Sequence, residues 1–157
     1  MKLIHKSYKF KIFPTKEQES LLSKHFGHCR FVFNYFLNER KEKYSNEKIS
    51  LNYYDNARTL TELKKDEEFL WLKEVNSQSL QASIKNLDTA FLNFFKKQNK
   101  FPKFKSRKHK NTFTVPQFGK LEDGKIILPK FKGGIKVKLH REVKGEIGKM
   151  SITKTPT

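Results

Sequence analysis

The spacing of apolar residues changes twice along the chain, and these changes constrain the fold more than any other feature. Residues 3–13 alternate between apolar and polar side chains, as a half-buried strand does. A long segment with helical spacing follows, and period two returns from Phe113 onward. A lone strand is not stable by itself, so the first strand must pair with strands beyond the helical segment. We therefore expect an α+β fold: a small antiparallel β-barrel or wedge, residues 1–14 and 111–157, with an inserted bundle of about three helices, residues 15–110.

The inserted segment carries apolar stripes typical of amphipathic helices. In its first and third helices the stripe residues recur at spacings of 4, 3, 4 and 3: Leu22, Phe26, Cys29, Phe33 and Phe36, then Leu80, Ile84, Leu87, Phe91 and Phe94. Thr15 and Gln18 predict a capping box at the start of the first helix. Asn52 can cap a shorter second helix, and Asn76 or Ser77 can cap the third.

Loops and strands are indicated elsewhere. The first helix is expected to end near Lys43, with a loop over residues 44–52. The expected later strands are Phe113 with Val115, residues 125–128, residues 135–139 and residues 147–152. Asp123-Gly124, between two apolar runs, predicts a hairpin turn.

Positive charge dominates the composition. The chain has 34 Lys and Arg residues against 16 Asp and Glu, a formal net charge of +18. Residues 96–110 alone hold eight Lys or Arg and no acid, with Phe101 and Phe104 between the charges. Such an excess is usually relieved by a polyanionic partner, because Lys and Arg neutralise a phosphate backbone and release its counterions. We therefore expect DNA, RNA or both as partners, the alternative being a solvated basic surface.

Other partner classes are disfavoured. Cys29 is the only cysteine, which excludes an internal disulfide and a four-cysteine zinc site. His25, His28 and Cys29 are too few for a zinc site, so we predict no metal. No run of about 18 apolar residues and no signal peptide is present. We expect no membrane partner, no small-molecule substrate and no cofactor, and a cytoplasmic location.

Six segments, read in order, resemble the N-terminal part of one protein family. They are YKFKIFPTKEQE, GHCRFVFNYFLNER, LTELKK, WLKEVNSQSLQASIKNLDTAFLNFF, FPKFKSRK and LPKFKGGIKVKLHR. Together they cover most of the chain. The family they resemble is that of the TnpB (OrfB) proteins of bacterial insertion sequences, whose full-length members are RNA-guided DNA nucleases related to type V CRISPR effectors.

The resemblance implies a fold and a role. It implies a wedge-like barrel with an inserted helical recognition lobe, often described as a helix-turn-helix, and a bacterial protein that joins the nucleoid when bound to DNA. In full-length relatives this half holds guide RNA, opens the target duplex and reads the short motif beside the target. A RuvC-type nuclease half follows, with three metal-binding carboxylates and a four-cysteine zinc finger.

The chain ends at SITKTPT, where the resemblance places the start of that nuclease half. We therefore expect the nucleic-acid-binding portion of such a nuclease, without catalytic residues and not itself an enzyme. One alternative is a free-standing helix-turn-helix regulator, or transposase accessory module, that uses no RNA. Another is an active transposition nuclease, which the missing acids disfavour.

The candidate contact residues fall into two sets. Gln81 and Lys85, with Ser77 one turn before, are candidates for duplex contact because Gln can pair with adenine and Lys can reach guanine or phosphate. Tyr53 and Thr114 join this set through the resemblance alone. The alternative is that Gln81 and Lys85 only solvate the helix.

The second set comprises candidates for phosphate or RNA contact. They are Arg30, Arg40, Lys100, Lys103, Lys105, Arg107, Lys108 and Lys110. The charge density of the lysine-rich segment favours phosphate contact there. Arg30 and Arg40 could instead be ordinary residues of a helix surface. Phe101, Pro102 and Phe104 are expected to anchor the segment to the core rather than to stack on bases.

Overall fold

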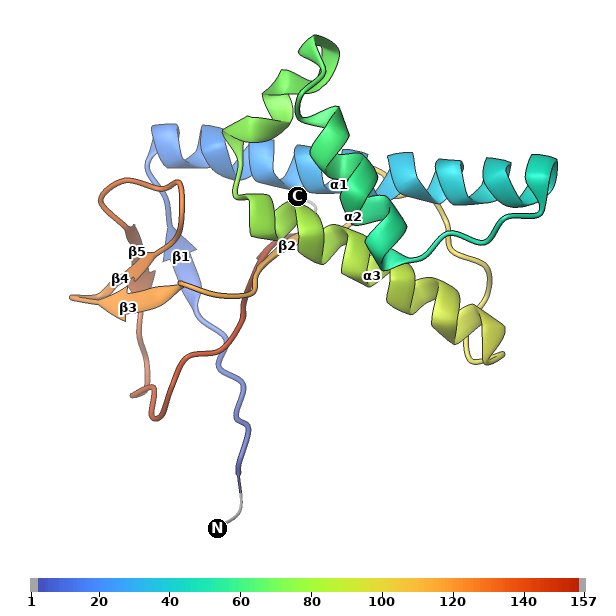
Figure 1. Ribbon diagram of the computed structural model, residues 1–157. Coiled ribbons are helices and arrows are strands. Elements are labelled where there is room, and N and C mark those ends of the chain that lie inside the picture. Colours follow the sequence, from blue (N-terminus) through green and yellow to red (C-terminus); the bar gives the residue numbers. More distant parts are fainter. Residues whose placement is uncertain (1–2, 156–157) are drawn as a thin grey trace.

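The computed structural model describes residues 3–155, which form helices and two small antiparallel sheets (Figure 1). The helices are α1 (Lys16–Glu47), α2 (Tyr53–Leu63), the 3₁₀ helix η1 (Glu67–Glu74) and α3 (Ser77–Phe95). The strands are β1 (Lys11–Phe13), β2 (Asn111–Val115), β3 (Lys120–Glu122), β4 (Lys125–Ile127), β5 (Ile135–Lys138) and β6 (Met150–Lys154). In Figure 1 the sheet that contains β1 lies beside the start of α1, and the helices extend away from it.

The predicted capping box starts α1. The Gln18 backbone N–H donates to the Thr15 hydroxyl at 3.2 Å, and the Thr15 N–H donates to the Gln18 side chain at 3.0 Å. The Gln18 amide also donates to the carbonyl of Gly134 at 2.6 Å, which ties the helix to the turn before β5. All five predicted stripe residues of α1 are buried. The helix runs to Glu47, about one turn beyond its expected end, and Lys43 pairs with Glu47 across that turn at 2.8 Å.

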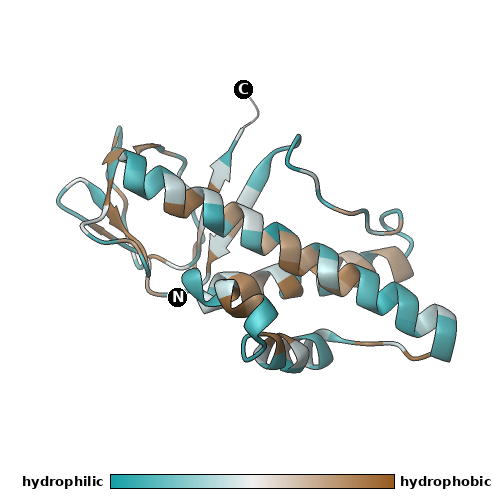
Figure 2. Cartoon of the chain, turned by 90° about the horizontal axis from the view of Figure 1, so that it is seen from above, coloured by the Kyte–Doolittle hydropathy of each residue, from teal (hydrophilic) through white to brown (hydrophobic). Residues whose placement is uncertain are grey.

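The other helices begin where the capping residues predict. Asn52 and Asp55 form a reciprocal capping box at α2, and the side chain of Asn76 accepts from the Gln78 N–H at α3. Four stripe residues of α3 are buried, and Phe94 is half-buried. Figure 2 shows hydrophobic residues in the middle turns of α1 and hydrophilic residues in its last turns. This distribution places the main helical core where α1 and α3 pack together.

The first strand joins strands from the far end of the chain, as expected. β1 pairs antiparallel with β5, with Ile12 opposite Val137, in a sheet of order β1-β5-β4-β3. β2 pairs antiparallel with β6 in a separate two-stranded sheet. The β3–β4 connection is the predicted hairpin, and both Asp123 and Gly124 have positive φ, at 49° and 73°.

A closed barrel is not formed within residues 3–155. The strands make two open sheets because they are only three to five residues long and no ladder joins the two sheets. Of the expected strand at residues 3–13, only Lys11–Phe13 pairs, since its partner β5 has four residues. The last strand lies at Met150–Lys154 rather than residues 147–152, in the register set by its pairing with β2.

One hydrophobic cluster connects the helices with both sheets. Phe113 and Val115 of β2 belong to it together with Ile135 of β5 and the buried stripe residues of α1 and α3. Phe36, at the middle of α1, is fully buried, and truncating such a side chain to Ala costs about 3–5 kcal/mol. The strand β2 is thereby held against α1 and α3.

Candidate nucleic-acid interface

A groove opens between α2, α3 and β2, and we call it the α3 groove. It encloses about 370 Å³ and is lined by Tyr53, Gln78, Gln81, Ala82, Lys85, Asn86, Thr114, Pro116, Gln117 and Lys149. Of the five residues expected to contact a duplex, four line it. Ser77, the first residue of α3, is exposed and does not. The groove therefore gathers residues from three elements that are far apart in the sequence.

The α3 groove presents an aromatic ring, amides, a hydroxyl and ammonium groups. Lys85 extends over the ring of Tyr53, with its Nζ 5.3 Å from the ring centroid. Gln81 is exposed on the same face of α3, and Thr114 is half-buried on β2. The side-chain oxygen of Gln78 is buried without a hydrogen-bond partner among the described residues. Amides, hydroxyls and ammonium groups are the side chains that hydrogen-bond base edges and phosphates.

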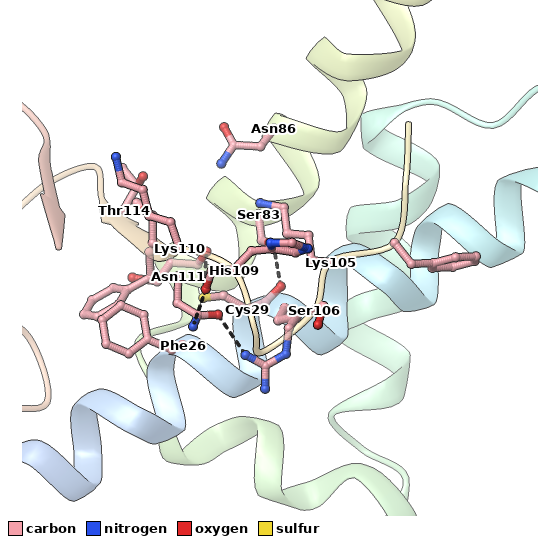
Figure 3. Close-up of a pocket in the computed structure, with 15 residues that line it drawn as sticks. Phe26, Cys29, Ser83, Asn86, Lys105, Ser106, His109, Lys110, Asn111 and Thr114 are labelled. Atoms are coloured by element: carbon pink, nitrogen blue, oxygen red, sulfur yellow. Dashed lines mark hydrogen bonds between the residues drawn. The ribbon is translucent and has the colours of Figure 1, made fainter. Parts of the chain in front are cut away.

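A second hollow, which we call the basic pocket, lies between α1, α3, the loop after α3 and β2 (Figure 3). It encloses about 370 Å³ and is lined by Phe26, Cys29, Arg30, Ser79, Ser83, Asn86, Phe104, Lys105, Ser106, His109, Lys110, Asn111, Thr112, Phe113 and Thr114. None of these described residues is acidic. The pocket therefore carries cationic and neutral polar groups without a carboxylate to balance them.

Arg30 is held at the wall of this pocket. Its Nη1 donates to the side-chain oxygen of Asn111 at 2.9 Å, and the Asn111 amide nitrogen donates to the carbonyl of His109 at 3.1 Å (Figure 3). Burial, and then the neighbouring charge of Arg107, lower the pKa of Arg30. Both causes disfavour the positive charge, which an incoming anion would stabilise.

Lys105 is fixed through its backbone. The Asn34 side chain donates to the Lys105 carbonyl at 2.9 Å and accepts from the Lys105 N–H at 2.7 Å. Although the residue as a whole is exposed, its ammonium lies 4.4 Å from the centroid of the Phe33 ring. Desolvation there lowers the pKa of Lys105. Burial raises the pKa of the neighbouring Cys29 thiol to about 12, so Cys29 stays neutral and supplies no countercharge.

The two hollows are adjacent. Asn86 of α3 and Thr114 of β2 line both of them. A strand of nucleic acid lying in the α3 groove would therefore meet the basic pocket directly beside it.

The remaining predicted cations have different environments. Lys100, Lys103, Arg107 and Lys108 are exposed along the loop, while Lys110 lines the basic pocket. Within residues 3–155, no Lys or Arg of residues 96–110 forms an ion pair with an acid. Arg40 is unlike them, since it is buried and bound to Asp88 at 2.9 Å. Its contacts favour a structural role.

Sequence reasoning missed several lining residues. Gln78 lies three residues before Gln81, on the same polar flank of α3 that helical spacing indicates, but it was not among the predicted contact residues. Lys149 joins the α3 groove because β6, which it precedes, pairs with β2 in a register the sequence does not reveal, and Gln117 follows two residues after the end of β2. Asn34, which lines neither hollow but fixes the backbone of Lys105, gave no signal, because nothing in the sequence marks its distant partner.

The part of the chain that the structure describes contains no cluster of three or more His, Cys, Asp or Glu arranged to hold a metal ion. His25 is buried and hydrogen-bonded on both ring nitrogens, to Leu21 and Asn76. None of the described helices has the length and apolar character needed to cross a membrane.

Comparison with known proteins gives similarities over most of the chain. A family model described as a helix-turn-helix domain, that of OrfB from IS605-type elements, matches residues 1–48, which include β1 and the continuous helix α1. The chain is 36% identical over 151 residues to the "Putative RNA-guided DNA endonuclease InsQ" of Escherichia coli (strain K12), covering 95% of this chain and 37% of that protein.

Two further relatives are similar over shorter stretches. A "Putative RNA-guided DNA endonuclease" of Streptomyces pristinaespiralis is 41% identical over 108 residues, which cover 69% of this chain and 27% of that protein. The "Virulence protein VsdF" of Salmonella dublin is 37% identical over 107 residues, 62% of this chain and 89% of that protein. The chain thus matches 27% and 37% of the length of the two proteins named as endonucleases.

Proposed function

Because the chain belongs to the TnpB (OrfB) family of insertion-sequence proteins, we propose that it binds guide RNA and the duplex beside a DNA target. In this proposal residues 1–14 and 111–157 form a wedge unit, and residues 15–110 form a recognition unit inserted into it. In this proposal the 157 residues bind nucleic acid and do not cleave it.

The observation that carries the proposal is the composition of the α3 groove. Gln81 offers a bidentate amide, which matches the N6 and N7 atoms of adenine, and Lys85 offers a donor for guanine or phosphate. Thr114 and Tyr53 approach the same space from β2 and α2. Convergence of these groups on one exposed groove favours duplex contact over simple solvation of the helix.

The basic pocket and its loop supply the phosphate contacts in this proposal. The ammonium of Lys105 and the guanidinium of Arg30 have no acidic partner there, and the backbone of Lys105 is fixed by Asn34. A phosphate would provide the missing negative charge and accept from both side chains. The exposed cations of the loop extend this surface along a strand.

Selection from a library of randomised duplexes tests the motif-reading part. The wild-type chain should enrich a short motif, and Gln81→Ala should relax the choice at one or two positions at a cost of about 1–3 kcal/mol. Lys85→Ala should weaken binding to all duplexes about equally and reduce the salt slope by about 1. Lys65→Ala, which removes an exposed lysine outside both hollows, is the matched control for Lys85→Ala. Equal enrichment by the wild type and Gln81→Ala would remove the α3 groove from the interface.

Copurification separates guide-RNA binding from the alternative of a regulator that uses no RNA. If the chain holds guide RNA, a transcript of defined structure should remain bound through purification and should be displaced by salt. Specific duplex binding by nuclease-treated, RNA-free protein, with no bound transcript beforehand, would instead support the free-standing DNA-binding module.

A further inference from the structure

Aromatic side chains are exposed where α3 ends and the basic loop begins. Phe95 is 70% exposed, Phe104 is 50% exposed and Phe101 is 40% exposed. Phe95 and Phe101 line neither the α3 groove nor the basic pocket, and Phe104 lies at the wall of the basic pocket. Exposed apolar area of this kind is characteristic of an interaction surface.

The exposed rings rest on buried ones. Phe91 is 8% exposed, and Phe95 stacks on it with the ring centroids 6.4 Å apart and the planes at 26°. Phe101 meets Phe91 and Phe94 edge to face, at 5.4 and 5.2 Å. The loop is therefore anchored to α3 through Phe101, as the sequence suggested, while part of the same ring stays open. These contacts hold the exposed faces in place before any partner arrives.

The charges around the rings indicate which partner fits. Nζ of Lys41 on α1 lies 6.0 Å from the ring centroid of Phe101 and 5.3 Å from that of Phe104, so one ammonium bridges the two rings. The sequence has no acid between Asp88 and Glu122. A second copy of the chain would bring the same positive loop to the contact and be repelled. A partner that supplies both flat apolar faces and negative charge is favoured.

Unpaired bases of a nucleic-acid strand meet both requirements. Every base has a π-face that stacks on aromatic side chains, and its phosphate is bound by nearby lysines. We propose that Phe95, Phe101 and Phe104 form a stacking platform for unpaired bases, with Lys41 and the loop lysines binding the phosphates of the same strand. This rests on the proposed function, because Phe104 places the platform beside the basic pocket, which adjoins the α3 groove. A strand that leaves a duplex in the groove would pass the pocket and reach the platform.

The test compares three probes with the whole 157-residue chain. The probes are a short blunt duplex, an oligothymidine of about 12 nucleotides, which is within the usual site sizes of single-strand binders, and the same strand with abasic sugars. Phe95→Leu with Phe104→Leu removes two aromatic faces and keeps apolar side chains. We expect this double variant to weaken oligothymidine binding by at least about fivefold, with the salt dependence unchanged. Binding of the abasic strand and of the blunt duplex should change less than about twofold.

Phe13→Leu is the matched control. Phe13 on β1 is also exposed, and Lys11 Nζ lies 5.4 Å from its ring centroid, but it is on the four-stranded sheet. This variant should bind all three probes as the wild type does. An independent readout on unmodified protein is 2-aminopurine placed in the strand, whose fluorescence should be quenched on binding because a stacked base is quenched.

The outcomes separate the platform from the function it rests on. Suppose that the blunt duplex binds. If the double variant then binds oligothymidine as tightly as the wild type, or if 2-aminopurine is not quenched, the stacking platform is refuted while duplex binding in the α3 groove is not. If neither the duplex nor the strand binds at low ionic strength, the proposed function itself fails. Stronger binding to anionic lipid vesicles than to the strand at equal salt would assign the exposed rings to a membrane surface and also overturn the platform.

Discussion

The imidazole Nε2 of His25 on α1 accepts a hydrogen bond from the backbone N–H of Asn76, the N-cap of α3, at 3.1 Å. The other ring nitrogen, Nδ1, contacts the Leu21 carbonyl at 2.9 Å, where it donates. The ring also packs against Phe113 at 4.9 Å and Phe131 at 5.0 Å. One buried, neutral side chain therefore connects the start of α3 with α1 and the strand region.

This arrangement predicts a pH-dependent stability. Burial, opposed by the bond to Leu21, lowers the pKa of His25 below its ordinary 6.5. The unfolded chain then binds the proton more readily than the native chain. Stability is fully present above about pH 6.5 and falls as the pH is lowered toward the native pKa, by at most about 1.4 kcal/mol per pH unit for one proton.

Urea unfolding between about pH 7.5 and 5.5 measures this effect. His25→Gln should remove most of the loss, and His28→Gln should remove a further part, because burial also lowers the pKa of His28. An undiminished loss of stability in His25→Gln would contradict the assignment.

Arg40 provides the second prediction. Its Nη2 binds Asp88 at 2.9 Å, its Nε donates to Asn56 at 2.7 Å, and its guanidinium lies 5.1 Å from the centroid of Phe91. Arg40→Ala should lower the free energy of unfolding by about 3 kcal/mol, because it leaves Asp88 and Asn56 without their partner. Chemical denaturation measures the loss.

Arg58→Ala is the control for Arg40→Ala, since its ion pair with Asp55 is exposed and contributes little. If Arg40→Ala were as stable as the wild type and bound RNA more weakly, the arginine would belong to the interface and not to the core.

The third prediction concerns the clamp of Asn34 on Lys105. Asn34→Ala removes both hydrogen bonds to the Lys105 backbone, so it should cost about 1 kcal/mol and release the loop. Hydrogen exchange of the Lys105 amide should accelerate, and nucleic-acid affinity should fall because a flexible loop loses more entropy on binding. Asn38→Ala, an exposed site one turn along the same helix, is the control. Unchanged exchange at Lys105 would mean that the clamp does not order the loop in solution.

The three α-helices could be predicted well because local rules determine them, whereas the 3₁₀ helix η1 was not predicted. The apolar stripes of α1 and α3 are buried as the spacing indicated, and Thr15, Asn52 and Asn76 cap the helices from their own side chains. The pairing of β1 with a distant strand could also be predicted, because an isolated strand would leave its backbone hydrogen-bonding groups unpaired.

The arrangement of the sheets and the lining of the two hollows could not be predicted from these rules. Whether short strands close into a barrel depends on registers between segments far apart in the sequence, and here they form two open sheets. Lys149 reaches the α3 groove through such a register. An arginine at this point of a helix is expected at the surface, yet the packing of α2 and α3 buries Arg40.

The salt dependence of binding tests the central claim most directly, that the loop cations bind phosphates. The wild-type chain should bind a short duplex and a structured RNA, with an affinity that falls steeply between about 50 and 200 mM salt. Replacing Lys103, Lys105, Arg107 and Lys108 by Ala should reduce the slope of log K against log salt by about 3–4 on duplex.

The matched control removes the same charge from exposed lysines elsewhere, Lys16, Lys65, Lys132 and Lys136, and should change that slope much less. We expect only the loop variant to bind weakly and to show a reduced salt dependence of binding. An unchanged slope in the loop variant, or no binding by the wild type to either nucleic acid at the lowest salt, would contradict it.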